Sequence, residues 1–221
     1  MSMPIFVKRI GYSDIYNSSE DSPTYFNKSG MQIDADGSPR AYHPQPGLGL
    51  DNLANAGRPG NWWGIVTDEN GNPVVQGKAD PAEGYYVSTT SLQDKRKNIT
   101  DPNRYVNSEL IPYFVLPQDI GIPVGLGDLG YAVNTVSKKS SGCIFADFCP
   151  PGMIGEGSIA LADAIGVPSN PKTGGVACGI MYFVFTGSSR GWPRDINDIR
   201  GNSQSLLDSL GGVDRLRSEL I

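Results

Sequence analysis

Two acidic residues, Asp147 and Glu156, stand nine residues apart in the segment 143–166, which reads CIFADFCPPGMIGEGSIALADAIG. Asp147 follows an apolar run typical of a strand, and Glu156 comes just before the pattern of a short helix. The Pro–Pro–Gly turn and the further glycines between them let a bulky polymer approach the backbone closely. Two carboxyl groups beside one cleft are the minimum equipment for hydrolysing a glycosidic bond. The spacing alone is more often found in solvated turns, so it indicates only a candidate site.

The helix expected after Glu156, over residues 159–165, has recognisable ends. Ser158 offers the hydroxyl of an N-cap, and Gly166 supplies the stop. The partial positive charge of a helix N-terminus favours the ionised form of Glu156. Burial and the nearby charge of Asp147 favour its protonated form instead. The sequence leaves this balance open.

Composition favours an all-β fold in a single domain, residues 1–221. The chain contains 28 glycines and 17 prolines among 221 residues, which is typical of many short strands and turns. Strands are expected where apolar, aromatic and β-branched residues cluster, at residues 5–10, 61–67, 74–78, 85–90, 111–116, 133–136 and 176–185. The last run is the most apolar and predicts a central strand.

The two ends of the chain are expected to lie outside the main β-structure. Residues 1–30 predict an N-terminal extension with one strand and a polar loop over residues 17–23. Residues 196–221 predict a C-terminal helical tail. Leucines and a valine from 206 to 220 stand there at helical spacing, but Gly211–Gly212 interrupts them, so we expect two short helices or one broken helix.

Charge and residue counts exclude several classes of partner and site. The net charge of −5 argues against nucleic acid and favours a cationic partner. The sequence contains no apolar run of 18 residues, so it predicts no membrane span. The single histidine argues against histidine-rich metal sites and a Ser–His triad. Three cysteines do not make a disulfide framework, and we expect three reduced, buried thiols.

A second pair of acids, Asp34 and Asp36, opens like a calcium-binding loop. The later ligands and the closing bidentate acid of such a loop are missing. Asp36–Gly37 instead predicts a turn in which the glycine adopts a positive φ. No metal and no cofactor is therefore predicted.

Five segments together resemble glycoside hydrolase family 75, the chitosanase family. They read IDADGSPRAYHP (33–44), GYYVSTTSLQD (84–94), IPYFVLP (111–117), GDLGYAVN (127–134) and FADFCPPGMIGEGSIALADAIG (145–166). The resemblance covers residues 31–187 and implies endo-hydrolysis of the β-1,4 links of chitosan, a cationic glucosamine polymer. By motif it places the two essential carboxylates on Asp147 and Glu156. It also implies a secreted protein, whereas the start of the chain has no apolar segment of a signal peptide after Lys8–Arg9.

The same resemblance suggests which residues hold the substrate. Asp34 and Asp36 match its I-D-x-D-G motif and are candidates for binding substrate amines. Tyr42 and His43 are expected to line the cleft. Aromatic side chains are candidate platforms for sugar rings, namely Tyr85 together with Trp62, Trp63, Tyr86 and Trp192, although a tryptophan in a strand more often belongs to the core.

A more distant likeness concerns the fold and the roles of the two acids. A strand, an acid–x–x–Pro turn and then I-G-E-G-S before an alanine-rich helix are similar to the corresponding stretch of double-psi β-barrel glycosidases and lytic transglycosylases. The likeness implies a double-psi barrel in which Glu156 is the general acid and Asp147 the base. Family 75 is regarded as inverting, which requires carboxyl groups about 6.5–9.5 Å apart.

The sequence leaves two other functions open. The substrate of the same site could be peptidoglycan, whose glycan also has β-1,4 links, in a cell-wall toxin or remodelling enzyme; the absence of a visible signal peptide motivates this alternative. The protein could also be a non-catalytic carbohydrate-binding module that has kept the fold. Loss of either acid would have favoured this last hypothesis, and both acids are present.

Overall fold

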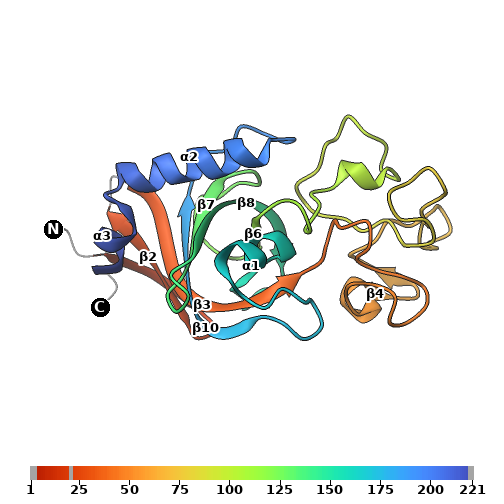
Figure 1. The fold of residues 1–221 in the computed structure, drawn as a ribbon, viewed down its shortest axis with the longest axis horizontal. Helices are drawn as coiled ribbons and strands as arrows, with labels where there is room; N and C mark the ends of the chain where they lie inside the picture. Colours follow the sequence, from red (N-terminus) through yellow and green to blue (C-terminus); the bar gives the residue numbers. More distant parts are fainter. Residues whose placement is uncertain (1–3, 20–21, 219–221) are drawn as a thin grey trace.

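The computed structural model describes residues 4–19 and 22–218, and strands dominate these ranges (Figure 1). The strands are β1 (Ile5–Ile10), β2 (Ser13–Ser19), β3 (Ser22–Asp34), β4 (Gly57–Arg58), β5 (Asn61–Trp62), β6 (Tyr113–Pro117), β7 (Leu129–Asn134), β8 (Ser140–Cys149), β9 (Glu156–Ser158) and β10 (Val176–Phe185). The helices of the described ranges are α1 (Ile159–Ile165), α2 (Ile196–Ser209) and α3 (Gly212–Ser218), with short 3₁₀ turns at Leu53–Ala56 and Pro102–Arg104.

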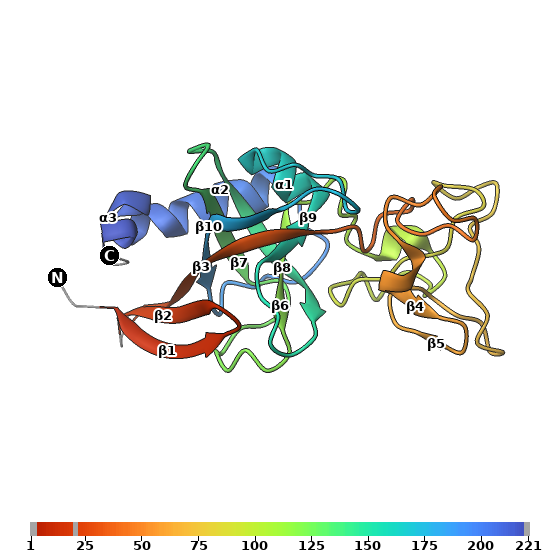
Figure 2. The same ribbon diagram turned by 90° about the horizontal axis from the view of Figure 1, so that it is seen from below.

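Six of these strands close into a barrel. Their order is β3–β10–β7–β8–β6–β9, and β9 pairs back with β3 to complete the ring. The pairs β3–β9 and β6–β8 are parallel, and the other four are antiparallel. The β1–β2 hairpin continues the sheet from β3 and lies beside it (Figure 2). The predicted all-β barrel is confirmed, as a closed barrel of six strands.

The central strand β10 is buried on both faces from Gly179 to Phe185, which explains the apolar character of that part. Its even-numbered side chains from 180 to 184 pack into the core cluster that α1 joins, and its odd-numbered side chains from 181 to 185 pack into the cluster that α2 joins. This alternation is the period of two that every strand has. Helix α1 covers one end of the barrel, and α2 lies along its outside (Figures 1 and 2).

The N-terminal part of the chain differs from the expectation. Of the polar segment 17–23, which was expected to be a loop, residues 17–19 end β2 and residues 22–23 begin β3, and residues 20–21 lie outside the described residues. The boundary expected at residue 30 falls inside β3, which pairs with both β2 and β10. Polar side chains such as Asn27 and Ser29 are buried within these pairings, so polarity did not mark the strand's limits.

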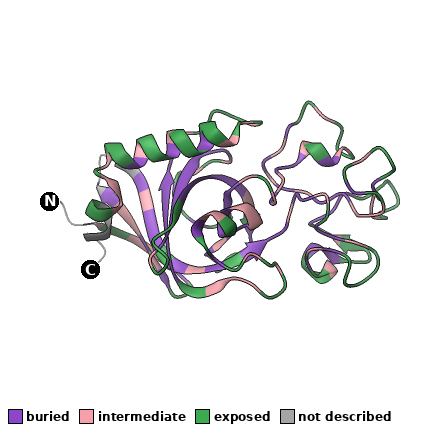
Figure 3. Cartoon of the chain, in the orientation of Figure 1, coloured by how far each residue is buried: buried purple, intermediate pink, exposed green. Residues whose placement is uncertain are grey.

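Residues 35–112 form a lobe of loops beside the barrel (Figure 1), with far more exposed surface than the strands have (Figure 3). The strands predicted at 61–67, 74–78 and 85–90 shrink to the two-residue β5 and isolated bridges, such as that between Val75 and Tyr86. Scattered backbone hydrogen bonds, such as that from the Val87 N–H to the Val74 carbonyl, connect these segments, and side chains add to them. The buried Gln76 amide, for example, donates to the carbonyls of Pro39 (2.6 Å) and Tyr86 (3.1 Å).

The predicted helix ends are confirmed. The Ser158 hydroxyl accepts a hydrogen bond from the Leu161 N–H, and Gly166 ends α1 in the left-handed conformation. The tail consists of two helices that part at Gly211, whose φ is +90°. Leu220, the last apolar position of the expected tail, lies outside the described residues.

The cysteines and the helices bear on two further expectations. All three thiols are free, but only Cys143 and Cys149 are buried. Cys178 is exposed, because it lies where β10 bulges away from its pairing with β3. No helix in the ranges 4–19 and 22–218 is long and apolar enough to cross a membrane.

Candidate active site

A cleft of about 1020 Å³ lies where the lobe meets the barrel. Barrel strands supply one wall, with Asp147 from β8 and Glu156 from β9. The lobe supplies another, with Tyr42, Asp51 and Trp63. Five acidic side chains line this cleft, and no Lys, Arg or His is among its described lining residues. The acids are Asp34, Asp36, Asp51, Asp147 and Glu156.

Asp147 and Glu156 stand level with each other across the sheet. Val115 of β6 pairs with Asp147 on one side and with Glu156 on the other, and Glu156 in turn pairs with Gln32 of β3. All four side chains line the cleft, so they form one row across four strands. Two interstrand spacings separate the backbones of the two acids, which amounts to about 10 Å.

A β-bulge sets the position of Asp147 in this row. Phe114 of β6 pairs with Phe145, but the next residue, Val115, pairs with Asp147, so Ala146 is the extra residue of β8. A bulge turns the following side chain relative to the regular alternation, and such features often border functional sites. Ala146 itself is fully buried and packs in the core.

Asp147 is partly buried and lies in a polar setting. Its Oδ1 accepts hydrogen bonds from the Ser91 hydroxyl (2.6 Å), the Ser91 N–H (3.2 Å) and the Phe148 N–H (2.8 Å). Burial raises the pKa of Asp147 to about 6, and these three donors oppose that rise. The site therefore holds an acid that ionises in mildly acidic solution.

Glu156 has a less polar setting. Burial, and after it the charges of Asp147 and Asp51, raises the pKa of Glu156 from an ordinary value of 4.5 to about 7. Glu156 lies in β9, two residues before the Ser158 cap of α1, and the partial positive charge of a helix falls off beyond its first turn. The balance that the sequence left open thus favours the protonated form of Glu156.

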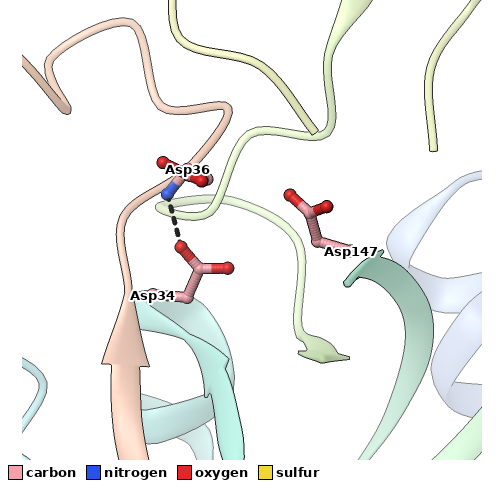
Figure 4. Close-up of side chains that lie close together, drawn as sticks. All are labelled: Asp34, Asp36 and Asp147. Atoms are coloured by element: carbon pink, nitrogen blue, oxygen red, sulfur yellow. Dashed lines mark hydrogen bonds between the residues drawn. The ribbon is translucent and has the colours of Figure 1, made fainter. Parts of the chain in front are cut away.

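Asp34, Asp36 and Asp147 form a tight carboxylate cluster (Figure 4). One oxygen of each lies within 4.8 Å of those of the other two, and the Asp36 N–H donates to Asp34 Oδ1 at 2.8 Å. Burial and the neighbouring carboxylates raise the pKa values of Asp34 and Asp36 well above 3.8. Three oxygens are fewer than the six to eight that a calcium ion takes, so these three carboxyl groups alone do not complete a calcium site.

The other expected substrate residues divide into two groups. Tyr42 lines the cleft and donates its hydroxyl to Asp36 Oδ1 at 2.6 Å. His43 and Tyr85 are not among the residues that line the cleft. They pack edge to face, with ring centroids 4.7 Å apart, and Tyr85 donates to the Leu48 carbonyl. The structure thus brings Asp34, Asp36 and Tyr42 to the two acids, and leaves His43 and Tyr85 outside.

The tryptophans divide in the same way. Trp63 lines the cleft with 61% of its surface exposed, and its Nε1 donates to the Asn55 carbonyl. Trp62 packs near Tyr86 in a small core of the lobe, and Trp192 packs against the barrel core. Of these candidate platforms only Trp63 has a ring that a sugar in the cleft could stack on.

Three residues of the site were not expected from the sequence. Asp51 is buried at the cleft wall, where its carboxylate accepts from the Asn52 N–H and the Asn55 side chain. Ser91 holds Asp147, and Phe148 is half-exposed beside it in the cleft lining. Asp51 stands in a Gly/Pro-rich loop and Ser91 in a polar run, so neither carried a local signal of its role.

The raised pKa values predict how stability depends on pH. Between about pH 4 and pH 7, native Glu156 and Asp147 bind more protons than their unfolded counterparts, so the free energy of unfolding falls as pH rises. Replacing Glu156 by glutamine removes the share of this fall in the free energy of unfolding that the ionisation of Glu156 causes. We expect the variant to gain on the order of 1–3 kcal/mol over the wild type at pH 8 and nothing at pH 4.

Thermal unfolding at pH 4, 6 and 8 measures this difference. Glu69→Gln is the matched control, because Glu69 is exposed in a turn of the lobe. The control is expected to follow the wild type at every pH. If the unfolding temperature of Glu156→Gln changed with pH in the same way as that of the wild type, the raised pKa of Glu156 would be contradicted.

Comparisons with known proteins add no family to this geometry. No protein-family model matches the chain, and no curated protein matches it in sequence. The likeness to glycoside hydrolase family 75 therefore stays a prediction that rests on the motifs of this chain.

Proposed function

We propose that this protein is an endo-acting glycoside hydrolase that cleaves the β-1,4 links of chitosan by inversion. The observation that carries the proposal is the row in which Val115 separates Asp147 from Glu156 by two strand spacings. Side chains that leave the sheet from backbones about 10 Å apart fit the carboxyl separation of about 6.5–9.5 Å that inversion requires, which leaves room for a water molecule. Retention would need the groups closer together, at about 5–5.5 Å.

The surroundings of the two acids favour distinct roles. Glu156, with a pKa of about 7, keeps its proton in mildly acidic solution and is suited to protonate the leaving oxygen. Asp147, with a pKa of about 6 and three hydrogen-bond donors on Oδ1, ionises first and is suited to act as base. A carboxyl group held by hydrogen-bond donors beside one in a less polar setting is the usual basis of such a division.

The proposed reaction is a single displacement. Asp147 takes a proton from water while the water oxygen attacks the anomeric carbon, and the bond from that carbon to the bridging oxygen breaks. Glu156 gives its proton to the bridging oxygen, which leaves as a hydroxyl of the departing sugar. Both carboxyl groups return to their starting states after one proton exchange with solvent.

The lining of the cleft favours a cationic glycan. Five acidic side chains face the space, and those that are ionised, such as Asp147, attract protonated glucosamine amines. Asp34, Asp36 and Asp51 are proposed to bind these amines, with Tyr42 holding Asp36 in place through its hydroxyl. Trp63 and Phe148 are proposed to stack on sugar rings.

We also propose that the barrel is of the double-psi kind. The six-stranded closure and the two parallel pairs, β3–β9 and β6–β8, support this assignment. So does the strand–turn–helix order from β8 through β9 to α1, which brings the second acid to the end of a barrel strand.

Two assays test the proposed substrate. Release of reducing ends from chitosan and loss of turbidity of purified peptidoglycan sacculi are measured with the same preparation, and with the Glu156→Gln variant as blank. The proposal predicts cleavage of chitosan, with a rapid fall in viscosity that marks internal cuts. Activity on sacculi alone would favour the peptidoglycan enzyme, and binding to chitosan without any hydrolysis would favour the non-catalytic module.

A further inference from the structure

A second hollow, of about 620 Å³, continues the cleft along β3. Gln32, which pairs with Glu156, lines both hollows, and Lys28 lies four residues earlier on the same strand, about 13 Å along it. The residues common to both linings are Met31, Gln32, Met153, Val176 and Ala177. A glycan chain bound across the two acids therefore has room to extend into this second hollow.

The β1–β2 hairpin, which lies outside the family-like segment 31–187, builds the outer wall of this hollow. Its turn residues Gly11 and Tyr12 line the space, and the turn touches the β8–β9 loop, where a β-carbon on Gly11 would lie 3.4 Å from the Gly152 carbonyl oxygen. The Tyr12 side chain is fully exposed. An exposed tyrosine offers a flat apolar face with a wet polar tip, which suits a sugar ring.

The second hollow differs from the cleft in charge. Its described lining contains no Asp or Glu, and its one charged side chain is Lys28. The lysine ammonium repels a protonated glucosamine amine, whereas a neutral acetamido group avoids that repulsion. Apolar side chains of Ile10, Met153 and Ile154 lie in the same lining and suit an acetyl methyl group.

We infer that this hollow is a distal subsite that prefers an N-acetylglucosamine unit, in a chain whose glucosamine units occupy the acidic cleft. The inference rests on the proposed function. Lys28 determines the preference by charge, and Tyr12 contributes a stacking surface. The preferred substrate of the enzyme would then be partly acetylated chitosan rather than the fully deacetylated polymer.

The test uses glucosamine hexamers that carry one acetylated unit at each position in turn, with products identified by mass spectrometry. In the wild type we expect the acetylated unit at a fixed distance, on one side, from the cleaved link, and cleavage of that isomer about fivefold faster than of the unacetylated hexamer. Lys28→Glu should reverse this preference. Lys78→Glu, which changes an exposed lysine of the lobe, should keep it.

A Tyr12→Ala variant tests the stacking surface separately. We expect its KM to rise about three- to tenfold on hexamers, with cleavage of trimers too short to reach the hollow unchanged. The subsite would be wrong if the position of cleavage in the hexamers did not depend on the acetylated unit, or if Lys28→Glu kept the preference of the wild type. Either result would leave the proposed hydrolysis standing. No cleavage of any hexamer by the wild type would overturn both.

Discussion

Replacing Glu156 by glutamine is expected to lower kcat on chitosan by ~10²–10⁴-fold. The amide keeps the shape of the side chain but has no acidic proton to give to the leaving oxygen. The loss should shrink on aryl glycosides with good leaving groups, because these depart without protonation. Steady-state rates on both kinds of substrate measure the difference.

Two features make this result specific to a general acid. Glu69→Gln carries the same chemical change on an exposed turn of the lobe and should keep full activity. The folded state of Glu156→Gln is expected to be at least as stable as the wild type at pH 8, so unfolding cannot account for the loss. An equal loss on good and poor leaving groups would contradict the assigned role.

Replacing Asp147 by asparagine should abolish turnover to a similar extent, ~10²–10⁴-fold, on every leaving group. The variant still has the acid but cannot activate water. Added azide is already a nucleophile and needs no base, so it is expected to restore turnover. Attack from the face that water uses would give a glycosyl azide of inverted configuration, which NMR identifies.

The matched control is Asp163→Asn, which removes an exposed carboxylate from α1. It should keep wild-type activity and show no response to azide. If azide rescues Glu156→Gln and leaves Asp147→Asn inactive, the roles of the two acids are reversed.

The parts of the fold that the sequence predicted are those fixed by local chemistry. Ser158 and Gly166 mark the ends of α1 because a hydroxyl cap and a left-handed glycine act within one helical turn. The run 176–185 predicted β10 with its observed bounds, since a strand that is buried on both faces over most of its length, here Gly179 to Phe185, is apolar at successive positions. Gly211 likewise marks the break in the tail.

The parts that the sequence missed depend on partners distant in the chain. Residues 85–90 have the composition of a strand, but in the lobe they make only single bridges, because their backbone groups bond to several different segments instead of to one neighbouring strand; Tyr86 N–H donates to Tyr42, for example, and Val87 N–H to Val74. The start of β3 is polar, and its pairing with both β2 and β10 makes it a strand nonetheless. Propensity yields to tertiary context in both cases.

The candidate site shows the same division. The motif indicated Asp147 and Glu156, but their separation depends on β6, whose Val115 lies between them and comes from another part of the chain. The bulge at Ala146 cannot be recognised from an apolar run. Asp51 reaches the cleft only because the lobe folds back onto the barrel, which no local pattern indicates.

The most direct test of the account is proton NMR of a glucosamine hexamer during the first minutes of its hydrolysis by the wild-type protein. A single displacement between Asp147 and Glu156 predicts internal cleavage in which the α-anomer appears first at the new reducing end and then mutarotates. A β-anomer that appears first would contradict the inverting geometry. A hexamer that stays intact would contradict the proposed hydrolysis itself.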